Sequence, residues 1–326
     1  MPEVGLKVRI EVESHNGSTS FEGIVLHPAS KGHLPLKLVN GYNASYLIEE
    51  VSNLEIIDSS TNIVQQTEQQ QVIEYNSKLP RIKILHTGGT IASKVDYKTG
   101  AVVARFEPHE LVASVPELAE IANIEAEKLG NMFSDDIRCQ HWNKMIDASK
   151  KAFDDGCDGV VITHGTDTLH ITSAALNFAW AGKGQAPPGP IALVGSQRSS
   201  DRGSSDAAEN LIAAVHWAAN APNPCGTAGD STVVVMHSSS NDGKCSIHPG
   251  TGVRKLHSTR RDAFRPVNSQ PIGFVSTKSG NVSLELTSDY EKQIGGSDTE
   301  ICTNPTKYST TVRIIQFMAG PWLHGE

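Results

Sequence analysis

Two short apolar runs, each closed by a turn of glycine and threonine, constrain the fold of this 326-residue chain more than any other feature. The first run, 82–85, leads into TGGTI at Thr87–Ile91, and the second, 160–162, leads into HGTDT at His164–Thr168. Each turn precedes a segment with helical periodicity. Because open parallel sheets bind ligands where strands end and helices begin, we expect both turns to face one crevice.

Strand and helix patterns alternate through the middle of the chain. Strands are expected at 82–86, 159–163, 191–195 and 232–236, and helices at 141–154, 168–180 and 206–217. The helices place apolar residues near one face of a 3.6-residue period, and Asp206 with Glu209 forms a capping-box-like start. This alternation predicts an α/β domain at 80–290, built on a parallel sheet with helices on both faces.

The first 57 residues follow a different pattern. Apolar and polar residues alternate from Leu6 to Val12, as in a half-buried strand, and the pair Asn40-Gly41 is typical of a hairpin turn. We therefore expect a small SH3-like all-β domain at 1–57. Residues 58–79 include a glutamine-rich stretch that buries little apolar area, so they are expected to form a linker.

Composition excludes several classes of function. No apolar run approaches the roughly 18 residues that span a bilayer. The five cysteines include no C-x-x-C pair, and the histidines show no H-E-x-x-H spacing. Neither a disulfide framework nor a metal site is therefore expected, and a reducing cytoplasm fits best. A net charge of -8 makes the isolated chain a poor electrostatic match for nucleic acid.

The first turn matches neither the P-loop nor the dinucleotide-binding pattern. Gly88 and Gly89 let the backbone approach a ligand closely, and they leave N–H groups that could hold a developing oxyanion. Thr90 then has two possible roles: its hydroxyl points into the crevice, or it caps the helix that follows.

The second turn offers the Thr166 hydroxyl and the Asp167 carboxylate, which could serve a substrate. The alternative is that Asp167 or Thr168 caps the helix that begins at Leu169. His164 stands at a strand end and is expected to be structural. Ser134 belongs to another polar turn, before a helix. Lys255 lies in a loop, where basic residues are usually solvated; drawn into a crevice beside threonine and aspartate, it is a candidate base.

Taken together, these turns resemble the asparaginase family over about 82–288. The resemblance implies that Thr90 is a nucleophile that attacks a side-chain amide, and that Tyr97 assists it. Gly89 would line the same substrate site.

The resemblance also implies a second catalytic group. Thr166, Asp167 and Lys255 match a Thr-Asp-Lys set that activates a hydroxyl or water. Asp167 and Ser134 match residues that hold the amino-acid head group of the substrate.

Within the family, one branch is more similar than the others. The segment GSQRSSDRGSSDA at 195–207 resembles the glutaminase subunits of archaeal-type Glu-tRNA(Gln) amidotransferases, as do 254–264 and the added β domain. The resemblance implies hydrolysis of glutamine and delivery of ammonia to a tRNA-binding partner, the E subunit of the amidotransferase, where ATP and Mg²⁺ are expected. No cofactor is expected in this chain. We expect the chain to form a homodimer within a heterotetramer.

The resemblance further predicts a small second α/β domain after a linker at 291–310. Residues 311–326 match only its first strand, at 312–317, so we expect most of that domain to be absent. Two alternatives to the amidotransferase subunit remain: a stand-alone L-asparaginase, and an interaction scaffold without activity.

Overall fold

The computed structural model describes residues 2, 6–14, 17–25, 32–38, 43–58, 75–89, 91, 93–96, 101–104, 115–182, 184–199, 204–223, 230–277, 281–294 and 299–311. Four features predicted from the sequence lie outside these residues: Thr90, Tyr97, the Asn40-Gly41 turn and the strand at 312–317.

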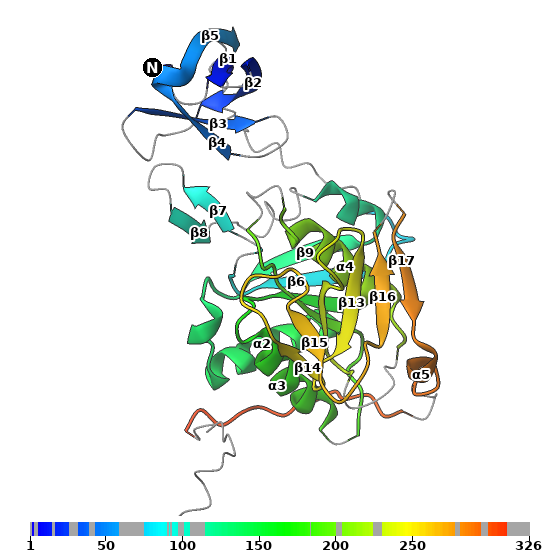
Figure 1. Ribbon diagram of the computed structural model, residues 1–326. Coiled ribbons are helices and arrows are strands. Elements are labelled where there is room, and N and C mark those ends of the chain that lie inside the picture. The colour runs from blue at the N-terminus through cyan, green and yellow to red at the C-terminus, as the bar shows by residue number, and fades with distance from the viewer. Residues whose placement is uncertain are drawn as a thin grey trace, which may run out of the picture.

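The N-terminal region forms a five-stranded antiparallel sheet with the order β4-β3-β2-β1-β5 (Figure 1). Its strands are β1 (Lys7–Ser14), β2 (Gly17–Val25), β3 (His33–Leu38), β4 (Asn43–Leu47) and β5 (Val51–Asp58), with the short 3₁₀ helix η1 (Ile48–Glu50) before β5. Val8 and Ile10 of β1 are fully buried and pack with Leu34 and Leu36 of β3. The period-two pattern therefore predicted the buried face of this all-β unit correctly.

The second region is built on an eight-stranded mixed sheet with the order β17-β16-β13-β12-β11-β10-β6-β9. Five of its strands run parallel: β6 (Arg81–His86), β9 (Asn123–Lys128), β10 (Gly159–Thr163), β11 (Ile191–Val194) and β12 (Val233–His237). The other three, β13 (Lys244–Pro249), β16 (Gly273–Ser276) and β17 (Ser283–Leu286), are antiparallel. This antiparallel edge was not predicted. Six residues between β12 and β13 allow a hairpin but no parallel crossover.

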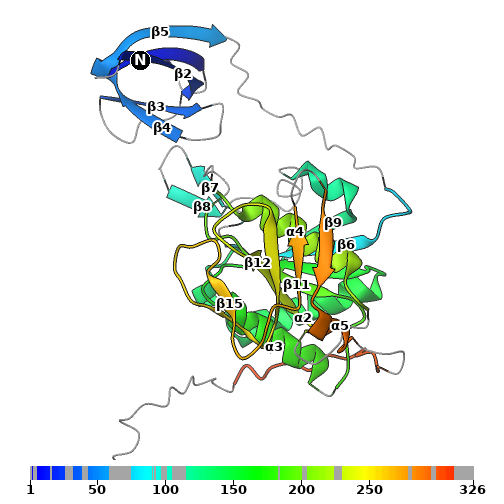
Figure 2. The same ribbon diagram turned by 45° about the vertical axis from the view of Figure 1, so that its right-hand side comes forward.

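Helices cover both faces of the mixed sheet, as predicted (Figure 2). The helices are α2 (Cys139–Asp154), α3 (Leu169–Ala181), α4 (Ala207–Asn220) and α5 (Ser288–Glu291), with the 3₁₀ helices η3 (Pro116–Glu120) and η4 (Ser134–Asp136). Alternate residues of each central strand face opposite helices. Val161 packs with α4, whereas Val160 and Ile162 pack with α2 and α3.

Two short hairpins complete the described strands. They are β7 (Ser93–Asp96) with β8 (Ala101–Ala104), and β14 (Val253–Lys255) with β15 (Phe264–Pro266). Among the described helices, none combines the length and apolar character that a bilayer crossing requires.

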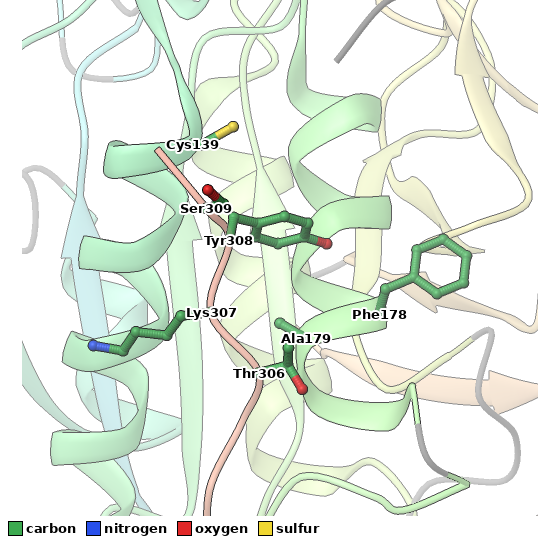
Figure 3. Close-up of a pocket in the computed structure, with 7 residues that line it drawn as sticks. All are labelled: Cys139, Phe178, Ala179, Thr306, Lys307, Tyr308 and Ser309. Carbon is green, nitrogen blue, oxygen red and sulfur yellow. The ribbon is translucent and has the colours of Figure 1, made fainter. Parts of the chain in front are cut away.

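Residues at the edges of the predicted linkers pack against the α/β region. Asn123 donates from its amide to the carbonyls of Asn76 and Leu79, both at 2.8 Å. Near the other end, the Tyr308 hydroxyl donates to the Ala175 carbonyl at 2.7 Å. Figure 3 shows the segment 306–309 running between α2 and α3, beside a pocket of about 330 Å³. The residues around this pocket include none of those predicted for catalysis.

One buried histidine makes the stability of this region depend on pH. His248 of β13 is 2% exposed, and neither ring nitrogen has a hydrogen-bond partner among the described residues. Burial, and then the charge of Arg265, lowers its pKa from 6.5 to about 3. Between these values the unfolded chain binds a proton that the folded chain does not. Stability is therefore lost as pH falls through this window.

We expect His248→Leu to flatten the pH dependence of the free energy of unfolding between about pH 6 and 4. The largest change in slope is about 1.4 kcal/mol per pH unit, the value for one proton. Urea unfolding at a series of pH values measures it. A variant whose slope equals that of the unsubstituted protein would contradict this assignment.

Candidate active site

The two glycine- and threonine-bearing turns leave neighbouring strands of the sheet. In the parallel pair β6 and β10, His86 lies opposite Thr163. The Thr87 backbone N–H and hydroxyl both donate to the Thr163 carbonyl, at 3.2 and 2.9 Å. The His86 Nδ1 and Thr163 Oγ1 atoms are 2.7 Å apart. The carboxyl ends of these strands are thereby held together, and both turns start from one edge of the sheet.

Glycine allows three separate segments to meet at this edge. Gly89 has a φ of +89°, and a Cβ atom there would lie 2.6 Å from the backbone nitrogen of Gly165. A Cβ atom on Gly165 would in turn lie 2.9 Å from the Ser134 Cβ atom. Gly88, with a φ of +118°, would bring its Cβ atom to 2.5 Å from the backbone of Met132. The two predicted turns therefore contact each other, and both contact the segment 132–134, the first turn at Met132 and the second at Ser134.

Lys255 joins this group from the β14–β15 hairpin. Its Nζ atom donates to Thr166 Oγ1 at 2.8 Å and to Asp167 Oδ1 at 2.7 Å. The Lys255 side chain is only 10% exposed, whereas that of Asp167 is 63% exposed. The ammonium is thus withdrawn from solvent while the carboxylate still faces it. These three side chains, predicted as one set, lie in direct contact.

The helix-capping alternative does not describe the second turn. Thr168 is the residue before α3, yet its side chain makes no capping hydrogen bond. Its hydroxyl donates instead to the carbonyl of Ser134 at 2.7 Å. Asp167 is engaged with Lys255. The polar side chains of this turn therefore tie distant segments together rather than capping the start of α3.

His164 is fully buried and orients the second turn. The Trp142 indole donates to Thr172 Oγ1 at 3.1 Å, and Thr172 Oγ1 lies 3.0 Å from His164 Nε2. The Thr172 hydroxyl can then donate to Nε2, which leaves the proton on Nδ1 for the Gly165 carbonyl, 2.6 Å away. Burial lowers the pKa of His164 to about 4, so the ring is neutral near pH 7. This supports the structural role expected of it.

Asp206 organises the neighbouring strand end, in a way that the sequence pattern did not predict. Its buried carboxylate accepts the backbone N–H groups of Gln197 and Arg198, at 3.0 and 2.9 Å, and the Ser196 hydroxyl at 2.8 Å. It makes no cap to α4, so the predicted capping box is wrong. The Asp206 oxygens accept backbone N–H groups of the turn after β11 instead of the N–H groups at the start of α4.

Two further residues support the Lys255 hairpin and were missed by sequence reasoning. The Gln197 side chain donates to the carbonyls of His257 and Arg260, at 3.2 and 3.0 Å. The buried Asp262 carboxylate pairs with Arg260 at 2.8 Å and also with Arg265. The available signal for Asp262 was a single carboxylate among three arginines, in the run RRDAFR at 260–265. A buried carboxylate requires charged partners, and two of these arginines supply them.

A lysine, two hydroxyl-bearing turns and a carboxylate therefore meet at one edge of the sheet, the constellation for which the sequence predicted the asparaginase family. The family model "Asparaginase, N-terminal" matches residues 81–289. The chain belongs to the asparaginase family.

Curated relatives of this chain are named as the D subunit of glutamyl-tRNA(Gln) amidotransferase. The protein from Pyrococcus abyssi is 40% identical over 91% of this chain and 65% of its own length. Those from Thermococcus kodakarensis and Methanosarcina acetivorans are both 41% identical, over 97% and 88% of this chain and 69% and 65% of their own lengths. This chain therefore spans about two thirds of these relatives.

Among solved structures, a probable cytoplasmic L-asparaginase from Campylobacter jejuni matches with a TM-score of 0.48 and 29% identity. The match covers 63% of this chain and 55% of that one.

Proposed function

We propose that this chain is the glutaminase subunit of a tRNA-dependent amidotransferase, which releases ammonia for the conversion of Glu-tRNA(Gln) to Gln-tRNA(Gln). The contact of Lys255 Nζ with both Thr166 Oγ1 and Asp167 Oδ1 carries this proposal. A shielded lysine beside a hydroxyl and a carboxylate can move a proton during amide cleavage. The similarity to amidotransferase D subunits supports glutamine as the amide donor.

The proposed reaction has two acyl-transfer steps. Thr90 attacks the glutamine carboxamide, and ammonia leaves; water then attacks the acyl-enzyme and releases glutamate. A threonine hydroxyl is a weak nucleophile without a base, and Lys255 acting through Thr166, or Tyr97, would supply one. Backbone N–H groups beside Gly89 would stabilise the oxyanion, and Asp167 with Ser134 would hold the amino-acid head group.

The partner follows from the same proposal. We propose that it is the E subunit of the amidotransferase, which binds Glu-tRNA(Gln), ATP and Mg²⁺, with two copies of each chain in the assembly. The net charge of -8 supports this division, because a tRNA-binding surface is then required of the partner and not of this chain. A reaction on tRNA supports a cytoplasmic location.

Coexpression with an E-type partner tests the proposal. We expect glutamine hydrolysis to exceed asparagine hydrolysis, and to rise when the partner and Glu-tRNA(Gln) are added. A reactive glutamine analogue should label one threonine, identified by mass spectrometry of the digested protein, and Thr90→Ala should abolish the label. Asparagine hydrolysis that is independent of the partner would instead indicate an asparaginase. A folded complex with neither turnover nor label would indicate a scaffold.

A further inference from the structure

Three side chains outside the proposed active site converge at the end of β12. Glu209 belongs to the first turn of α4, His237 is the last residue of β12, and Asp242 lies in the loop that follows. One ligand atom from each lies within 4.8 Å of the others. The His237 side chain is fully buried, Glu209 is 28% exposed and Asp242 is 73% exposed. The group is therefore buried at the His237 end and open to solvent at the Asp242 end.

The tautomer of His237 is set by a buried amide. The Asn210 Nδ2 group donates to the Gly195 carbonyl at 3.0 Å and to Asp206 Oδ2 at 2.9 Å. These two acceptors orient the amide, so that its oxygen faces His237 Nδ1 at 2.7 Å. Nδ1 must then carry a proton and donate it. The other nitrogen, Nε2, is left with a lone pair directed at the group.

The Nε2 atom is completely buried, and among the described residues it makes a charged-group contact with Glu209 but no hydrogen bond of ordinary geometry. It lies 3.2 Å from Glu209 Oε2, and that oxygen already accepts the Gly243 N–H at 2.8 Å. Two acceptors at this separation repel each other unless a cation lies between or beside them. The cation is either a second proton on the ring or a metal ion.

The geometry favours a metal ion over a proton. An N–H bond at Nε2 would lie in the plane of the ring. Glu209 Oε2 is 3.2 Å from Nε2, but it is not aligned with that bond well enough to accept a hydrogen bond. Two ligands of one tetrahedral zinc ion, each about 2.0–2.1 Å from it, lie about 3.3–3.4 Å apart. The separation of 3.2 Å between Nε2 and Oε2 is close to that ligand–ligand distance. A fixed Nδ1–H on the opposite side is the usual support for a metal-binding histidine.

We propose that Glu209, His237 and Asp242 form a binding site for a divalent transition-metal ion, with Zn²⁺ as the preferred ion. One imidazole nitrogen and two carboxylate oxygens suit zinc, and the exposed side of the group leaves the fourth position to water. The ligand atom of Asp242 moves into place by rotation of an exposed side chain.

Arg261 opposes this site by its charge. Its guanidinium pairs with Asp242 and with the Ser240 carbonyl. Metal binding therefore requires Asp242 to turn away from Arg261, and the neighbouring positive charge weakens the affinity for a cation. Removing that charge should strengthen binding, whereas removing a ligand should weaken it.

Competition for Zn²⁺ against a coloured chelator at pH 7.5 tests the site. We expect one Zn²⁺ per chain, bound more weakly by at least about tenfold in Glu209→Gln and in Asp242→Asn, and more tightly in Arg261→Gln. Asp289→Asn, which removes an exposed carboxylate from α5, is the matched control and should bind like the unsubstituted chain. Thermal unfolding without metal checks that every variant is folded.

Absence of Zn²⁺ binding would overturn the proposal. Equal affinity in all the variants would also overturn it, since the ion would then be bound elsewhere. The readout is metal affinity, so neither outcome depends on the proposed glutaminase function.

Discussion

Replacing Lys255 by glutamine is expected to lower the rate of glutamine hydrolysis by about 10²–10⁴-fold, the usual contribution of a general acid–base group. Lys255 Nζ touches both Thr166 and Asp167, and its side chain is only 10% exposed. Glutamine keeps much of the length and polarity but cannot accept a proton. The free energy of unfolding should fall by only about 1 kcal/mol, because Asp167 remains solvated when its partner is lost.

Two companion variants separate a proton-transfer role from an electrostatic one. Lys255→Arg keeps the charge but does not release a proton near neutral pH, so it should be nearly as inactive as Lys255→Gln. Arg254→Gln changes the exposed neighbour in the same strand and should be active. Steady-state glutamine hydrolysis by the complex with the partner measures all three. Activity of Lys255→Gln within about threefold of the unsubstituted enzyme would exclude Lys255 from the chemistry.

Replacing Gly89 by alanine is expected to damage both stability and activity. The φ of +89° costs a residue with a Cβ atom about 1–2 kcal/mol. The added atom would also lie 2.6 Å from the Gly165 nitrogen, and backbone cannot rotate away as a flexible side chain can. The two turns must therefore separate. Because a displacement of about 1 Å can cost about 10²-fold in rate, we expect at least that loss of glutamine hydrolysis.

Gly184→Ala is the matched control for this prediction. Gly184 also has a positive φ, +76°, but no atom lies within 4 Å of a Cβ built there. In this variant the free energy of unfolding should fall only by the conformational cost of about 1–2 kcal/mol, and the activity should be unchanged. Urea unfolding gives the two free energies, and a titration with a reactive glutamine analogue corrects the rates for the folded fraction. Equal losses in the two variants would show that the contact between Gly89 and Gly165 has no effect.

The secondary structure of the α/β region was predictable because its signals are local. The four strands expected from the pattern, β6, β10, β11 and β12, and the helices α2, α3 and α4 fall within a few residues of their expected positions. The β13, β16 and β17 strands follow hairpin or loop connections. Their antiparallel direction depends on connection length rather than on residue pattern.

The candidate site was predictable in part. The resemblance placed Thr166, Asp167 and Lys255 in one set, and the structure brings their side chains together. The roles of Thr90 and Tyr97 remain predictions from the sequence.

Hydrophobic periodicity and the two glycine–threonine turns determined, from the sequence alone, that a wound sheet presents hydroxyl groups at its carboxyl edge. Only the tertiary structure decided what else reaches that edge. Gln197 and Asp262 brace the Lys255 hairpin, and Asn210 sets the tautomer of His237, through contacts between residues as few as two and as many as 63 positions apart. Buried polar groups must find hydrogen-bond partners, and which partners lie within reach depends on how the chain packs. No periodic pattern in the sequence records these pairings.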